Sequence, residues 1–60
     1  MDNKQVKEAI LKERKVVVDA ISTVQFTYGG EEYPPHVKGI MAKLQANLEK
    51  IDSLLEEVDQ

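Results

Sequence analysis

Residues 25–35 read QFTYGGEEYPP, and this stretch decides how the chain folds. It holds both prolines, two of the three glycines and all three aromatic residues. Because proline and glycine both disfavour a helix interior, we expect a connector here that is not helical. The Gly29-Gly30 pair predicts a tight turn, since primed two-residue turns need the positive φ that glycine tolerates. The connector is therefore either a short loop or a β-hairpin with strands 26–28 and 31–33.

The segment after the connector carries one continuous apolar stripe. Its apolar residues recur at steps of four and three, which places their side chains on one face of a helix. Pro35 suits the first helical position, where a missing N–H costs nothing. Ile40 and Leu54 lie beside the stripe and widen it toward the face of a bundle helix. We predict a helix over about 36–58 whose apolar residues, here called the seam, are Val37, Met41, Leu44, Leu48, Ile51, Leu55 and Val58.

The segment before the connector predicts a second amphipathic helix, over about 3–24. Asp2 or Asn3 can cap its first turn. Glu13 falls on the apolar stripe of this helix, where an apolar residue would be expected. It either reaches solvent along its stem or pairs with a base across a subunit interface, where an ion pair can fix register. The apolar residues at helical spacing are Val6, Ile10, Val17, Ala20, Ile21 and Val24.

Two helices of similar length with one connector predict an antiparallel helical hairpin, so residues 1–60 form one domain of the all-α class. A single hairpin leaves half of each apolar stripe in contact with water. We therefore expect two chains to pair into a four-helix bundle, as a homodimer or a higher oligomer. The predicted oligomer interface is taken from the seam and comprises Val37, Met41, Leu44, Leu48, Ile51 and Leu55.

Composition and charge narrow the class of protein. A chain of 60 residues without cysteine has no disulfide and no thiolate metal site, and its core is small for independent folding. The net charge is -3, with five bases and four acids in residues 1–24 but three bases and seven acids in residues 25–60. This asymmetry indicates pairing between helices or subunits and argues against nucleic acid as a partner. With no signal-peptide pattern and no membrane span, we expect a cytoplasmic protein that does not contact a membrane.

Catalysis is poorly supported by the sequence. His36 is the single histidine, the residue type most often used as a general acid or base, and it stands at a helix start as an ordinary polar residue. The Gly29-Gly30 pair is followed by Glu31 and Glu32, which would repel a phosphate group. We expect that the protein is not an enzyme and has no catalytic residue, cofactor or metal site.

The connector is the predicted working surface. Aromatic side chains are over-represented among binding hot spots, and loops shaped by glycine and proline often carry function. The alternative is structural, since the aromatic residues could close the end of the bundle. The candidate partner-binding residues are Phe26, Tyr28, Glu31, Glu32 and Tyr33.

These observations favour a small protein-interaction module: an adaptor, an inhibitor or an assembly component that binds itself and a larger protein. In element order, the whole chain resembles the W-type head-tail joining proteins of tailed bacteriophages, with residues 26–33 at the place of their hairpin. That resemblance implies a structural or assembly role as an alternative.

A nucleic-acid-binding helical dimer is a further alternative. A two-fold dimer could place two first helices side by side, in a layout that resembles the two-helix Rop dimers in size and arrangement. The interleaved acids weaken the resulting field, and no aromatic residue stands among the bases to stack on nucleotides. The bases concerned are Lys4, Lys7, Lys12, Arg14 and Lys15.

Overall fold

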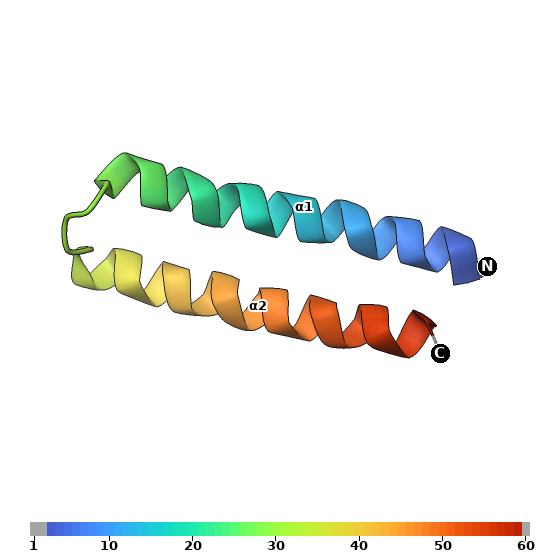
Figure 1. The fold of residues 1–60 in the computed structure, drawn as a ribbon. Coiled ribbons are helices and arrows are strands. Elements are labelled where there is room, and N and C mark those ends of the chain that lie inside the picture. The colour runs from blue at the N-terminus through green and yellow to red at the C-terminus, as the bar shows by residue number, and fades with distance from the viewer. Residues whose placement is uncertain (1–2, 60) are drawn as a thin grey trace.

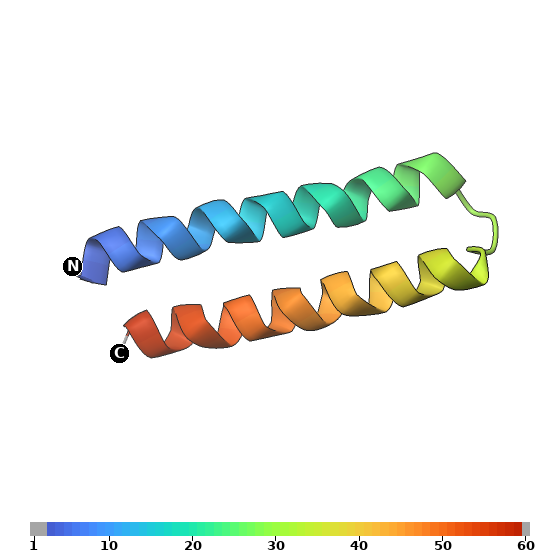
Figure 2. The ribbon, with the colours of Figure 1, turned by 180° about the vertical axis from the view of Figure 1, so that it is seen from behind.

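The computed structural model describes residues 3–59, which form two α-helices joined by a short loop (Figure 1). Helix α1 spans Asn3–Tyr28 and helix α2 spans Pro35–Asp59. The helices lie side by side and antiparallel in both opposite views, so residues 3 and 59 are at the same end of the molecule (Figures 1 and 2). The molecule measures 43 × 15 × 15 Å. The predicted helical hairpin is confirmed, and it has the shape of a rod.

Helix α1 is longer than the sequence indicated. The prediction that residues 25–28 are not helical is wrong, because the helix ends at the first glycine and not at the aromatic residues before it. Gly29 adopts a left-handed φ of 56°, and its N–H donates a hydrogen bond to the carbonyl of Gln25 at 2.9 Å. This is the αL type of helix C-cap, which glycine provides without a steric penalty.

Residues 29–34 form a loop, and no residue of the described range 3–59 is in a strand. The β-hairpin alternative is therefore wrong. The loop residue Glu31 donates its N–H to the carbonyl of Tyr28 at 3.0 Å, which continues the turn begun at Gly29. The carbonyl of Pro34 accepts the N–H groups of Val37 and Lys38 at 2.9 Å each.

Helix α2 begins at Pro35, the residue that the sequence favoured for the first helical position, one residue before the predicted start at about 36. Proline suits this position because the first N–H groups of a helix have no intrahelical partner. Of the two residues proposed to cap α1, Asn3 is its first helical residue, and Asp2 lies outside the described residues.

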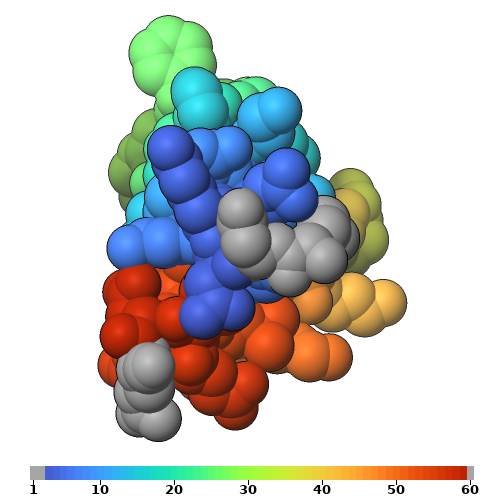
Figure 3. All heavy atoms as spheres, turned by 90° about the vertical axis from the view of Figure 1, so that its right-hand side faces the viewer, coloured from blue at the N-terminus to red at the C-terminus, as the bar shows by residue number. Residues whose placement is uncertain are grey.

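The core is the single contact between the two helices. Among the described residues four side chains are buried, with 5–8% of their surface exposed: Val17 on α1, and Val37, Met41 and Ile51 on α2. The other seam residues are half-buried, so the predicted seam is the face of α2 that is shielded from water. Viewed along the rod from its open end, the blue atoms of α1 press directly onto the red atoms of α2 (Figure 3). Within residues 3–59, no other element covers the far sides of either helix.

The three glycines lead to a stability prediction. Gly39 lies within α2, and a Cβ added there meets open space. We expect Gly39→Ala to raise the free energy of unfolding by about 0.5–1 kcal/mol, because alanine loses less backbone entropy in a helix. We expect Gly29→Ala to lower it by about 1–2 kcal/mol, because alanine is strained in the left-handed region. Urea unfolding followed by circular dichroism measures both changes.

Gly30 is the matched control for these two variants. It lies next to Gly29, has no positive φ, and also has open space around its Cβ position. Gly30→Ala should therefore change the free energy of unfolding by less than about 0.5 kcal/mol. Equal losses at Gly29 and Gly30 would contradict the assigned helix cap.

Candidate interaction surfaces

The inward stripe of α1 contains Arg14 in the place where the sequence suggested Glu13. In the structure Glu13 is exposed and Arg14 is half-buried. The Nε atom of Arg14 donates a hydrogen bond to Oδ1 of Asp52 on α2 at 2.8 Å. The spacing from Ile10 and Val17 led to Glu13 as the expected inward residue. Residues three or four positions apart share one face of a helix, so Arg14, four residues after Ile10, fits the spacing equally well. The long guanidinium side chain takes this place because it can pack its stem and still reach an acid.

A second ion pair joins the helices nearer the open end of the rod. The Nζ atom of Lys7 lies 2.7 Å from Oδ1 of Asp59. Lys7 and Arg14 are one heptad apart on α1, and Asp52 and Asp59 are one heptad apart on α2. One antiparallel register therefore satisfies both pairs. The charge asymmetry between the two halves of the chain thus corresponds to pairing between helices.

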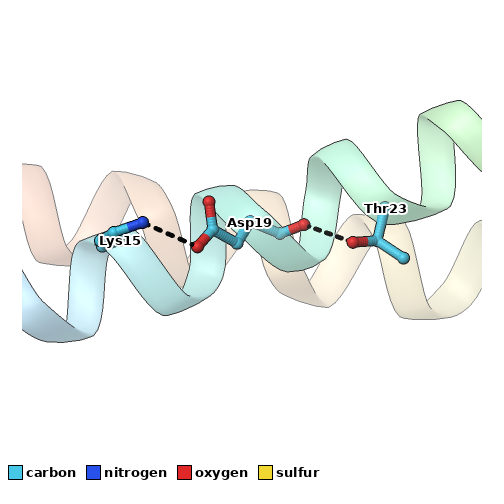
Figure 4. A network of polar contacts seen from close by, with 3 residues as sticks. All are labelled: Lys15, Asp19 and Thr23. Atoms are coloured by element: carbon cyan, nitrogen blue, oxygen red, sulfur yellow. Dashed lines mark hydrogen bonds and ion pairs between the residues drawn. The ribbon is translucent and has the colours of Figure 1, made fainter.

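Other polar contacts on α1 remain within that helix. Lys15 Nζ lies 3.1 Å from Oδ2 of Asp19, and the Thr23 hydroxyl donates to the carbonyl of Asp19 at 2.9 Å (Figure 4). The Thr27 hydroxyl makes the same kind of bond to the carbonyl of Thr23 at 2.7 Å. Three of the five bases on α1 are thus paired with acids of the same chain. This pairing lowers the positive potential that nucleic acid would need.

The aromatic cluster divides into two parts. The rings of Tyr28 and Tyr33 pack edge to face, with centroids 5.6 Å apart and an interplanar angle of 76°. Both tyrosines are half-buried, and their contact closes the loop between the helices. Phe26 is 91% exposed and takes no part in this contact. Glu31 is exposed, and Glu32 pairs with Lys38 at 2.8 Å.

Four large apolar side chains lie exposed beside the core. Leu11, which is 45% exposed, follows Ile10 on the flank of α1 that also carries Lys7 and Arg14. Val16 is 62% exposed, Ile40 is 50% exposed and Leu54 is 40% exposed. Ile40 and Leu54 each come one residue before a seam residue. Asp52 and Asp59 each come one residue after a seam residue. Since one residue turns the helix by about 100°, the apolar pair and the acidic pair lie on opposite sides of the seam.

Val16 joins the same apolar side from α1. It directly precedes the buried Val17, and Ala20 lies one turn further along. Two antiparallel helices are related by an approximate two-fold axis normal to the plane that contains them. In both helices, the residues that come one position before the buried residues therefore lie on the same side of the hairpin. We call this side the open face and define it by Val16, Ala20, Ile40, Asn47 and Leu54. The exposed Glu13, one heptad before Ala20, lies on the same side.

The residues predicted to form the oligomer interface lie between α1 and α2 of one chain. Val37, Met41 and Ile51 are buried there, and Leu44, Leu48 and Leu55 are half-buried. Their apolar surface is largely used within the hairpin. The residues that remain available beside them are those of the open face, which the sequence had shown only as a widening of the stripe.

No enclosed site is present in the described part of the chain. His36 is exposed at the start of α2. Over residues 3–59 no pocket opens and no group of three His, Cys, Asp or Glu residues gathers as a metal site would need. Neither described helix is long and apolar enough to cross a membrane. The apolar surfaces that residues 3–59 expose are therefore the open face, the loop end with Phe26, and Leu11 on the opposite flank.

Comparison with protein-family models, with curated proteins and with solved structures finds no match to this chain.

The division of the aromatic cluster predicts different roles for its members. Tyr28→Ala and Tyr33→Ala each remove the edge-to-face contact, so each should lower the free energy of unfolding by about 1 kcal/mol or more. Phe26→Ala should change it by less than about 0.5 kcal/mol, because that ring is almost fully exposed. Thermal and urea unfolding of the three variants measure the difference. A loss at Phe26 equal to that at Tyr28 would refute the division.

The ion pairs between the helices predict a weak, salt-dependent coupling. The side chains of Arg14 and Asp52 are 41% and 50% exposed, so water screens their attraction. A double-mutant cycle with Arg14→Ala and Asp52→Ala should give a coupling free energy below about 1 kcal/mol that decreases as salt is added. The pair Lys15 and Asp19 within α1 is the control and should give about 0.3–0.5 kcal/mol. A larger, salt-independent coupling would show that the pair is buried in solution.

Proposed function

We propose that this chain is a non-catalytic protein-interaction module that works as a homodimeric four-helix bundle. The observation that carries the proposal is the amount of surface left exposed. The chain has 4778 Å² of accessible surface. A compact monomer of 6.8 kDa should expose roughly 4,000 Å², which leaves an excess of about 800 Å². That excess is about what one partner buries in an ordinary protein interface.

The shape of the molecule supports the same proposal. The radius of gyration is 13.9 Å, whereas a compact domain of this length would have about 10 Å. Within residues 3–59 the core holds four buried side chains, and the chain has no cysteine that could form a disulfide. Chains of this size need a staple such as a disulfide, a metal or a second subunit. A second copy provides that staple without any other component.

The open face is the surface that the second copy covers. It carries three exposed large apolar side chains on one side of the hairpin, contributed by both helices. The opposite side carries the acids that pair with Lys7 and Arg14. Covering the open face buries apolar surface and leaves these ion pairs in water, where charged groups are stable.

A larger protein is the second proposed partner, and the loop end is its contact. Phe26 is an exposed aromatic ring on the last turn of α1, with the exposed Glu31 nearby in the chain. Aromatic residues are common anchors at interfaces. This arrangement fits an adaptor, an inhibitor or an assembly component.

The alternative functions have less support. The W-type layout depends on a hairpin between the helices, and residues 26–33 form a helix end and a loop. Binding of nucleic acid would need free bases on α1, of which Lys7, Arg14 and Lys15 are paired with acids. We therefore carry neither alternative further.

Light scattering and circular dichroism over one concentration series test the proposal. We expect a mass of two chains and a loss of helicity on dilution, because folding and association are coupled when the core of one chain is too small. Leu54→Glu should shift both transitions to higher concentration, since it places a charge in the covered face.

Ser53→Glu is the matched control, because Ser53 is the neighbouring exposed residue on the outer side of α2. It should leave the mass and the dilution midpoint unchanged. A helical monomer at every concentration would overturn the proposed dimer.

A further inference from the structure

The open-face residues of α2 are evenly spaced, so two antiparallel copies of the helix can face each other in register. Asn47 lies midway between Ile40 and Leu54, one heptad from each, and all three side chains are exposed. Residues one heptad apart share one stripe of a helix. If a second α2 lies antiparallel against this stripe with Asn47 opposite Asn47, each Ile40 meets a Leu54. At both ends of the stripe an apolar side chain then faces another apolar side chain, and in the middle the amide groups of the two Asn47 residues face each other.

The central asparagine suits a two-fold axis. An asparagine side chain has both hydrogen-bond donors and acceptors, so two copies can satisfy each other when they face across an axis. A single polar asparagine in an apolar helix contact fixes register and orientation at some cost in stability. Sliding one α2 against the other by one heptad would place Asn47 opposite Ile40 or Leu54.

Helix α1 fits the same axis. The register of the ion pairs Lys7–Asp59 and Arg14–Asp52 places residue 19 of α1 level with residue 47 of α2. Val16 and Ala20 lie on either side of that level. The axis beside Asn47 therefore sets each Val16 near an Ala20 of the second copy. A large side chain then faces a small one, which lets the two helices approach closely.

We propose that a second copy of this chain docks on the open face with α2 antiparallel to α2 and α1 antiparallel to α1, about a two-fold axis beside Asn47. This inference rests on the proposed function, because it specifies the geometry of the proposed dimer. It also predicts that the two loop ends point away from each other.

One competing arrangement covers the same face. If the two rods lie parallel, α2 packs against α1 of the second copy, and Glu13 comes within about one turn of Lys50. In the proposed arrangement Glu13 has no such contact, and Lys43 comes near Lys50 instead, because these residues lie four and three positions on either side of Asn47. The two arrangements thus give Lys50 opposite electrostatic roles.

Single-cysteine variants distinguish the arrangements, because the chain has no cysteine of its own. The proposed axis places residue 47 opposite itself, so Asn47→Cys should form a disulfide-linked dimer under mild oxidation. With about 10 µM chain and an effective concentration of about 1 mM, linking should be about a hundredfold faster than by chance collision. Ser53→Cys, on the outer side of α2, is the control and should link only at the collision rate.

A mixed pair tests the register. Ile40→Cys alone should not link to itself, because two copies of residue 40 would be about 21 Å apart along the antiparallel helices. Leu54→Cys alone should not link for the same reason. An equal mixture of the two variants should give the linked heterodimer at a rate comparable with Asn47→Cys.

Removal of the Lys50 charge gives an independent readout. In the proposed arrangement Lys50→Gln relieves a repulsion, so the dimer Kd should fall by about twofold. The competing arrangement predicts a rise, because the variant loses the pair with Glu13. Lys12→Gln, at an exposed position on α1, is the control for the general effect of net charge.

The outcomes separate the geometry from the dimer itself. A wild-type mass of two chains together with linking at residue 47 and in the mixed pair supports the proposal. A mass of two chains without these links, or with a Kd that rises for Lys50→Gln, overturns the axis and leaves the proposed dimer standing. A wild-type mass of one chain at every concentration overturns both.

Discussion

In the part of the chain that the structure describes, each helix packs against one other helix, and that constraint governs the rest of the structure. A helix can bury only the stripe that faces its neighbour, so two helices share one narrow contact. Among residues 3–59 four side chains are buried in it, each with 5–8% of its surface still exposed, and the rest of the seam stays half-exposed. The rod shape and the large accessible surface follow directly. Every other apolar residue stays in contact with water unless a second chain covers it.

The contact is not uniform along the rod. Toward the loop, α1 contributes Val17, Ile21, Val24 and Tyr28 to it, and Val17 is buried. Toward the open end, Lys7 and Arg14 share the inward side of α1 with the half-buried Val6 and Ile10, and they reach acids on α2. Apolar burial therefore continues along the whole contact, and in the open half exposed ion pairs fix the register and add little free energy.

The sequence predicted the parts of the fold that depend on periodicity. The two helices, the antiparallel hairpin and the inward face of α2 follow from apolar spacing over many residues, where single deviations average out. The end of α1 and the role of Arg14 depend on one residue each. Whether a helix ends at Phe26 or Gly29 is decided by a local cap, and aromatic residues carry no signal that stops a helix.

The division of the candidate sites has a similar explanation. The sequence gathered Phe26, Tyr28 and Tyr33 as one cluster because they are close in the chain. An extra helical turn then directed Tyr28 toward Tyr33 and Phe26 toward solvent. By the register of the ion pairs residue 26 is level with residue 40, so in the proposed dimer the two exposed Phe26 rings lie about 21 Å apart along the rods. The antiparallel axis therefore presents two separate aromatic contacts, whereas parallel rods would place both rings at the same level along the bundle.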